Sequence, residues 1–141
     1  MNICYRDIKN DDLLSIQRLM LELGYPVEAD DLKRNIEEIL KRGGQLIIAE
    51  EERAIVGTVC VIIDARLAEG IYAEIVSLVV AVNARGKGIG KGLVKKAEDW
   101  AKERVHKVRV RANEVRHDAH LFYKSQGYKQ VKTQRIFIKM V

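Results

Sequence analysis

The residues best placed to do chemistry form a glycine-rich segment in the second half of the chain. Residues 85–92 read Arg-Gly-Lys-Gly-Ile-Gly-Lys-Gly, between an apolar run and a helical pattern. The first N–H groups of a helix have no intrahelical partners, and the helix dipole makes that end partly positive. Glycines let phosphate oxygens approach the backbone, and the basic side chains add charge. The segment therefore predicts an anion cradle suited to a pyrophosphate, rather than a turn that merely joins a strand to a helix.

Two common nucleotide-binding motifs do not fit this segment. A P-loop requires GxxxxGK followed by Ser or Thr, and Gly92 stands where that hydroxyl would be. A dinucleotide fingerprint requires GxGxxG, and both registers within 86–93 place a non-glycine residue third. The pattern that does match is R-x-x-G-x-G, from Arg85 through Gly88 to Gly90.

The elements around the segment alternate between strand and helix patterns. Apolar residues at helical spacing predict a helix of about 13–23, capped by Asp11 or Asn10 and ended by Gly24. Further helices are predicted at 29–41, after residue 90 and at 117–125, and strands at 2–6, 45–50, 54–64, 71–82, 107–112 and 128–140. The order β-α-α-β-β-β-α-β-α-β predicts a mixed α/β (α+β) sheet in a single domain of residues 1–141.

Composition narrows the classes of function. The formal net charge is +5, but the basic residues are dispersed and only 6% of the 141 residues are aromatic, so we expect no nucleic-acid partner. No apolar run approaches the ~18 residues of a membrane span, and the charged N-terminal sequence is unlike a signal peptide. We therefore expect no membrane partner and a cytoplasmic protein whose Cys4 and Cys60 are buried and reduced. No cysteine or histidine spacing resembles a zinc site.

Three segments together resemble the GNAT acetyltransferase superfamily. Residues 73–80 (AEIVSLVV) are similar to the central strand that splays from its neighbour in that fold, and 85–90 match its pyrophosphate loop. Residues 120–128 (HLFYKSQGY) are similar to its later A-x-x-F-Y-x-x-x-G-[FY] motif. The order and spacing agree over nearly the whole chain. Locally, residues 113–120 are most similar to the aminoalkylphosphonate acetyltransferases.

The resemblance implies a GNAT-type mixed, mostly antiparallel sheet flanked by helices, with acetyl-CoA (coenzyme A) as cofactor. Backbone groups of the central strand would pair with the pantetheine arm, and N–H groups of the glycine loop would hold the pyrophosphate. The residues thus assigned to the cofactor are Leu78, Val79, Val80, Arg85, Gly86, Lys87, Gly88, Ile89, Gly90, Lys91 and Asn113.

The resemblance also implies an N-acetyltransferase in which a primary amine attacks acetyl-CoA directly in a ternary complex. Such a reaction needs a base to deprotonate the amine, and Glu74 is the only charged residue between Ile71 and Val82. Apolar surroundings would make it a stronger base; the alternative is a glutamate paired with a nearby Lys or Arg. Tyr123 resembles the family tyrosine that protonates the leaving thiolate, with a core aromatic residue as the alternative. A strand N–H, that of Val79, would polarise the carbonyl.

The acceptor amine is not specified by the sequence. Tyr25 and His117 are candidate acceptor contacts, and His117 shares a helix face with His120, where the two could contribute to a metal or acceptor site. Many relatives, including the ribosomal-protein N-terminal acetyltransferases, carry an asparagine where Arg116 stands here. A small-molecule or protein amine, and a monomer or homodimer, all remain open. The alternative functions are a non-catalytic acyl-CoA-binding sensor or interaction module, and a nucleotide-binding protein.

Overall fold

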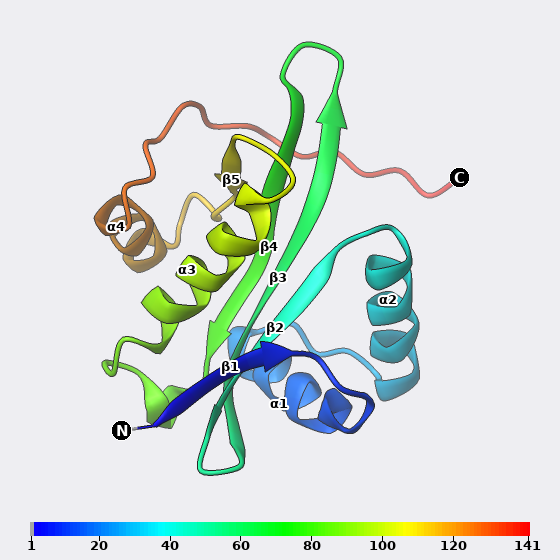
Figure 1. Cartoon of the computed structure of the whole chain (residues 1–141). Coiled ribbons are helices and arrows are strands. Elements are labelled where there is room, and N and C mark those ends of the chain that lie inside the picture. Colours follow the sequence, from blue (N-terminus) through cyan, green and yellow to red (C-terminus); the bar gives the residue numbers. More distant parts are fainter. Residues whose placement is uncertain (1) are drawn as a thin grey trace. The chain divides into compact units, whose positions relative to one another are not determined.

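The computed structural model describes residues 2–141 (Figure 1). They fall into two compact units, the first ending at Arg111 and the second spanning Ala112–Val141. The first unit contains the sheet and most of the helices. Its elements are β1 (Ile3–Asp7), the 3₁₀ helix η1 (Asn10–Asp12), α1 (Leu13–Leu23), α2 (Ala29–Lys41), β2 (Gln45–Glu51), β3 (Ala54–Arg66), β4 (Gly70–Val80), the 3₁₀ helix η2 (Val82–Ala84), α3 (Ile89–Lys102) and β5 (Val108–Val110).

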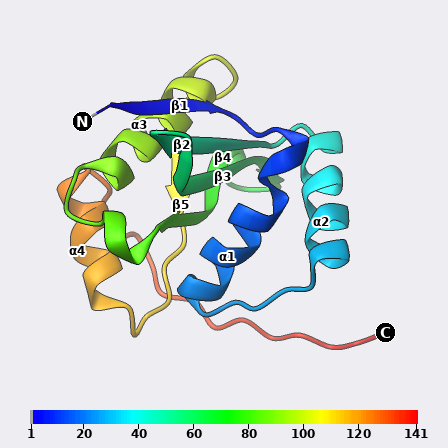
Figure 2. The same ribbon diagram turned by 90° about the horizontal axis from the view of Figure 1, so that it is seen from below.

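The sheet has the strand order β1-β2-β3-β4-β5. All neighbouring strands are antiparallel except β4 and β5, which are parallel because α3 connects them. Helices α1 and α2 lie on one face and α3 on the other (Figure 2). The core between these layers is built from β-branched and aliphatic side chains of β2, β3 and β4. The predicted mixed, mostly antiparallel sheet flanked by helices is confirmed.

Helix α1 begins and ends for different local reasons. Its N-cap is Asp12, and the predicted caps Asn10 and Asp11 lie instead inside η1. Asp12 accepts the Lys9 N–H (2.7 Å) and a bidentate pair of bonds from Arg6, so its carboxylate stabilises η1. The helix ends as predicted at Gly24, whose φ of 97° is left-handed.

Strand β4 carries an irregularity that matters for the site. Between Cys60 and Val61 the register with β3 shifts, so Ser77 opposes Cys60 while Ile75 opposes Val61. Val76 is therefore an extra residue, and such a bulge bends its strand. β5 pairs only with Ala73–Ile75. Within the described residues, the stretch of β4 beyond the bulge consequently has a strand neighbour on one side only.

The second unit contains α4 (His117–Ser125), as predicted, and no strand among its described residues. The strand predicted over 128–140 is wrong. A strand requires a ladder partner, and periodicity along one segment does not supply one. The run Ile136-Phe137-Ile138 also breaks strict alternation. The structure thus lacks the last β of the predicted order.

The two cysteines differ in environment. Cys60 on β3 is buried, which raises the pKa of its thiol to about 12. Cys4 is exposed because β1 is an edge strand with one outward face, so the expectation that both are buried is wrong. In the described part of the chain, no helix is long and apolar enough to cross a membrane.

Candidate cofactor and acyl-transfer site

The glycine loop has a geometry that an anion could occupy. Gly86 and Gly88 both have φ of 80°, and no atom lies within 4 Å of where a Cβ would stand on either. Gly88 is the N-cap of α3 and offers no side-chain cap. The first helical bond runs from the Gly92 N–H to the Gly88 carbonyl (3.0 Å), so the N–H groups before it are not used by the helix. These residues fit a bound pyrophosphate.

The charged side chains of the loop are held by the protein itself. Lys87 Nζ lies 3.4 Å from Glu51 Oε1 at the turn between β2 and β3. Arg85 donates from Nε to the Val80 carbonyl (3.3 Å). Ile89 is buried in the core beneath α3. The cradle is therefore formed by backbone groups, with its side chains bracing the loop.

The peptide groups of β4 beyond the bulge alternate in direction. The Ala81 N–H bonds to the Val56 carbonyl of β3 (2.8 Å), and the Val79 carbonyl also faces β3, 3.0 Å from where a Cβ on Gly57 would stand. By the alternation of an antiparallel ladder, Val79 pairs with β3 while Leu78 and Val80 direct their N–H and C=O groups away from it. The expected carbonyl-polarising role of the Val79 N–H is therefore wrong, because that group belongs to the ladder.

Glu74 lies on β4 before the bulge and is almost completely buried, with 8% of its side chain exposed. Its Oε1 accepts from Arg109 Nε at 2.7 Å and lies 3.4 Å from Arg111 Nε. Arg109 opposes Glu74 across the parallel β4–β5 pair and also contacts Glu69 Oε2 at 2.7 Å. The pairing with an arginine, the alternative to a catalytic base, is thus present. Both contacts use Oε1, and no described residue bonds Oε2.

The sequence predicted a basic partner for Glu74 as one alternative but did not identify it as Arg109. Residues 107–112 alternate basic and apolar side chains, a pattern that places Lys107, Arg109 and Arg111 on one face of β5. Arg109 also stacks over the buried Tyr72 ring, with its guanidinium carbon 4.3 Å from the ring centroid. The alternation indicates a basic face on this strand. Only the strand order shows that the strand lies next to β4, where Glu74 faces Arg109.

Three predicted site residues lie in the second unit. Burial raises the pKa of the Tyr123 phenol above its usual value of 10, so the hydroxyl keeps its proton at neutral pH. Asn113 accepts the Val115 N–H on its side chain (3.1 Å), and its carbonyl lies 2.8 Å from His120 Nε2. The rings of His117 and His120 meet edge to face, 5.7 Å apart, as their spacing predicts. In the part of the chain that the structure describes, these histidines join no group of three or more metal-binding side chains.

Tyr25 lies in the connection between α1 and α2, just after the α1 C-cap. Its N–H bonds to the Met20 carbonyl (2.9 Å), while its side chain is about half exposed. The backbone is thus anchored and the ring is accessible. A contact between Tyr25 and an acceptor remains a prediction.

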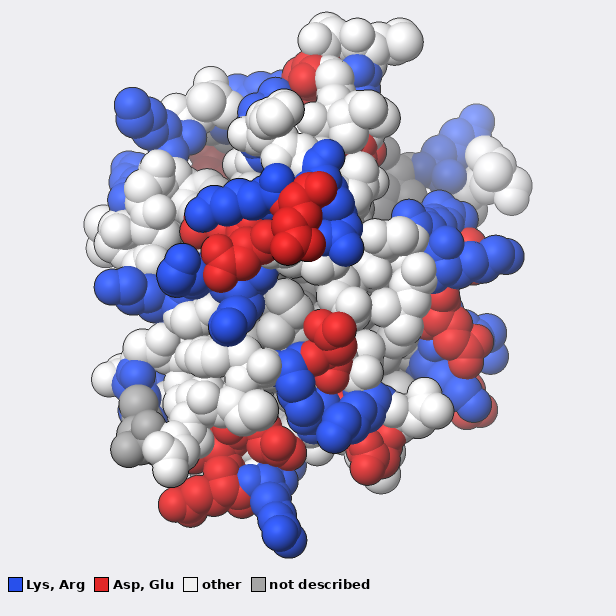
Figure 3. Space-filling model, in the orientation of Figure 1, with Lys and Arg blue, Asp and Glu red and all other residues white. Residues whose placement is uncertain are grey.

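Surface charge is mixed in sign on the face shown in Figure 3. On α3, Lys95 and Lys102 both lie near Asp99, and on α2 Arg42 pairs with Glu38. The positive net charge is therefore not gathered into one basic patch on this face.

Known proteins resemble this chain in sequence and in structure. Residues 10–128 match the acetyltransferase (GNAT) family. An uncharacterised N-acetyltransferase of Chlorobaculum tepidum is 32% identical over 93% of this chain and 78% of its own length. A transcriptional regulator from Bacillus halodurans has a TM-score of 0.85 and 27% identity over 97% of this chain and all of the other. An aminoglycoside N-acetyltransferase in complex with CoA has a TM-score of 0.88 at 15% identity, over 99% of this chain and 96% of its own.

The family match covers more than half of the chain, and the Chlorobaculum relative matches across nearly all of it. This chain therefore belongs to the GNAT family of acetyltransferases, enzymes that use acetyl-CoA as the acetyl donor.

Proposed function

We propose that this acetyltransferase moves the acetyl group to a primary amine by direct attack, with amine and cofactor bound together. The observation that carries the proposal is the cradle itself: two left-handed glycines with open space above them, at an uncapped helix N-terminus. Oriented N–H groups of this kind suit a pyrophosphate. Cys60 is disfavoured as an acyl-enzyme nucleophile because it is buried with its thiol protonated.

The residues that would hold acetyl-CoA follow from the backbone directions. The N–H groups from Gly86 to Lys91 would bind the pyrophosphate. The outward peptide groups of Leu78 and Val80 would bond the pantetheine amides as an added strand does, and one of their N–H groups would polarise the carbonyl in place of Val79. When bound, the cofactor supplies an acetyl group activated as a thioester.

Two side chains would manage the protons. Glu74 takes a proton from the acceptor ammonium through Oε2, directly or through one water, while both arginines hold Oε1 and orient the carboxylate. The amine nitrogen would then bond to the carbonyl carbon, and as the carbon–sulfur bond breaks Tyr123 would give its phenolic proton to the departing sulfur. The second proton of the attacking nitrogen would return to the Tyr123 phenolate, directly or through water, which leaves a neutral amide and a free thiol. The raised pKa of Tyr123 supports this acid role, because the phenol is protonated at neutral pH.

The acceptor would be a small-molecule or protein amine, contacted by Tyr25 and by His117. An aminoglycoside N-acetyltransferase shares the fold at 15% identity, so aminoglycosides are among the first amines to test. Because the family match crosses the boundary between the two units, we propose that they act as one catalytic domain. We also propose a cytoplasmic site of action, where the exposed thiol of Cys4 would stay reduced.

The first test is thermal unfolding with acetyl-CoA, free CoA, ATP and NAD in parallel. A ligand at a hundred times its Kd adds about 2.7 kcal/mol of stability, enough to raise Tm by several degrees. We expect a shift with acetyl-CoA and CoA only. No shift with either would refute the proposal, and a shift with ATP or NAD alone would indicate a nucleotide-binding protein.

A screen of amines for thiol release then tests catalysis. Retained CoA binding with no turnover on polyamines, amino acids, aminophosphonates, aminoglycosides or lysine peptides would favour an acyl-CoA sensor instead. With an active amine, Tyr123→Phe should lower kcat and leave the Kd for CoA unchanged, and an unchanged kcat would remove Tyr123 from the mechanism. For Glu74→Gln, a rate that recovers at high pH supports the base, whereas a wild-type pH profile rejects it.

A further inference from the structure

A carboxylate on α1 bonds to the backbone that leads into the cofactor loop. Glu22 Oε1 accepts the N–H of Val82 at 2.8 Å, joining residues 60 apart in sequence. Glu22 stands in the last turn of α1, and Val82 is the first residue of η2, which links β4 to the glycine loop. The bond thus connects the end of α1 to η2, the segment that leads into the glycine loop.

Apart from the burial of Ala81 and Ala84 and the bond from Arg85 to the Val80 carbonyl, few hydrogen bonds hold this backbone segment. The ladder between β4 and β3 ends with the Ala81 N–H, and η2 closes with the Ala84 N–H bonded to the Ala81 carbonyl (2.9 Å). Ala81 is the N-cap of η2 and has no side chain that could accept a hydrogen bond. Glu22 therefore supplies, from another element, the cap that η2 lacks.

The position of Glu22 within α1 does not serve that helix. An anionic side chain in the last turn is disfavoured by the helix dipole. Its neighbour one turn earlier, Arg18, bonds through a guanidinium nitrogen to the Ile55 carbonyl of β3 (3.3 Å) rather than to Glu22. Arg18 thus attaches α1 to the beginning of β3, and Glu22 attaches it to the backbone just after β4.

We infer that Glu22 is a positioning residue that holds Val82, and through it the cofactor loop of residues 85–90, against α1. The inference rests on the proposed function in that this loop binds acetyl-CoA. The α1–α2 connection that carries Tyr25 begins two residues after Glu22.

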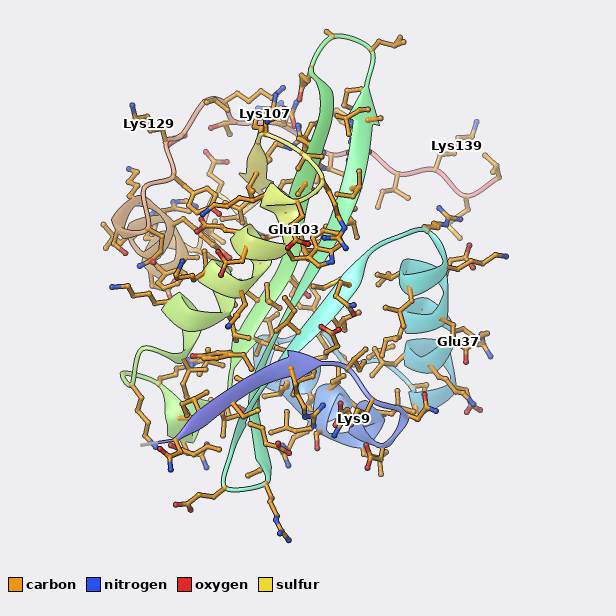
Figure 4. All side chains as sticks on the ribbon, in the orientation of Figure 1. Lys9, Glu37, Glu103, Lys107, Lys129 and Lys139 are labelled. Carbon is orange, nitrogen blue, oxygen red and sulfur yellow. The ribbon has the colours of Figure 1, made fainter. Side chains whose placement is uncertain are left out.

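Three variants isolate the bond. Glu22→Ala removes the acceptor, Glu22→Gln keeps an acceptor oxygen without the charge, and Val82→Pro removes the donor. Proline suits the first position of a helix, and Ala81 before it already has φ −53° and ψ 140°, as a residue before proline requires. The matched control is Glu37→Ala, the same change on the outer face of α2 (Figure 4), where the described residues offer Glu37 no partner.

The readouts are the Kd for CoA by calorimetry, steady-state kinetics with an active amine, and amide hydrogen exchange over residues 82–90 of the free protein. We expect Glu22→Ala to weaken CoA binding about three- to tenfold, within the net contribution of one exposed intramolecular hydrogen bond. KM for acetyl-CoA should rise with kcat unchanged, and exchange over 82–90 should speed up. Glu22→Gln should stay within about twofold of wild type, and Glu37→Ala should match it.

A double-mutant cycle separates this bond from general destabilisation. Val82→Pro should lose CoA affinity as Glu22→Ala does, and adding Glu22→Ala to it should cost nothing more. Additive losses, unchanged Kd in Glu22→Ala, or faster exchange over the whole chain would each overturn the inference. If wild type fails to bind CoA, the proposed function falls, and local exchange over 82–90 still decides whether Glu22 holds the loop.

Discussion

Substituting Gly88 by alanine tests two properties of that glycine separately: its left-handed backbone conformation and the open space that it leaves for a ligand. Gly88 has φ 80° and ψ 11°, and an L-residue in this left-handed region costs about 1–2 kcal/mol. At about 3 °C per kcal/mol for a domain of this size, Tm should fall by about 3–6 °C. The new methyl group meets no protein atom within 4 Å. It projects instead into the space that a phosphate oxygen would occupy. The binding free energy of CoA should therefore weaken by about 1.5–3 kcal/mol, which raises Kd roughly ten- to a hundredfold.

The control for this substitution is Gly43→Ala in the turn between α2 and β2. Gly43 has φ 87° and equally open surroundings, so the backbone strain is matched. Both variants should lose similar Tm in the absence of ligand, measured by calorimetry, while only Gly88→Ala should lose CoA affinity. Equal affinity for CoA in wild type and both variants would refute the placement of the pyrophosphate at Gly88.

Two further predictions concern stability. A Cβ on Gly92 would overlap the Tyr5 phenol, so Gly92→Ala should lower Tm through about 1–3 kcal/mol of overpacking. In a Tyr5→Ala background the same change should raise Tm, because alanine favours helix by about 1 kcal/mol. Hydrogen bonds from Arg6 lower the pKa of Asp12, so that ion pair stabilises the fold above pH ~4, near the unfolded pKa, and is lost as pH falls through the lower folded value. The difference in urea midpoint between wild type and Asp12→Asn should therefore be large at pH 7 and shrink below pH 4; a constant difference would contradict this.

Local signals predicted the elements well. The bounds of α2 and α4 follow from apolar spacing, and the end of α1 follows from a glycine that can adopt positive φ. The cradle was also predictable, because a glycine-dense turn that opens a helix leaves its first N–H groups free. These features depend on residues close together in sequence, so the sequence carries them directly.

Features that depend on pairing could not be predicted in the same way. Whether the Val79 N–H faces β3 or the cofactor depends on the ladder register, and a bulge at Val76 changes that register. The arginine partner of Glu74 depends on the order of strands, and the bond from Glu22 spans 60 residues. The strand expected at the C-terminal end failed for the same reason, since alternation does not provide a partner.

The glycines of residues 86–92 show why a glycine-rich composition alone overestimates how many residues can contact a ligand. Gly86 and Gly88 leave space that the protein does not fill, whereas the space at Gly92 is already taken by Tyr5 from β1. Gly92 is thus a packing glycine that lets β1 approach α3, and it takes no part in the cradle. A side chain there would overlap the Tyr5 phenol, so either Tyr5 or the first turn of α3, whose N–H groups would bind the pyrophosphate, would have to shift. In the proposed function the two kinds of glycine act together: Gly86 and Gly88 leave room for the pyrophosphate, and Gly92 lets β1 pack against the helix whose N-terminus would bind it.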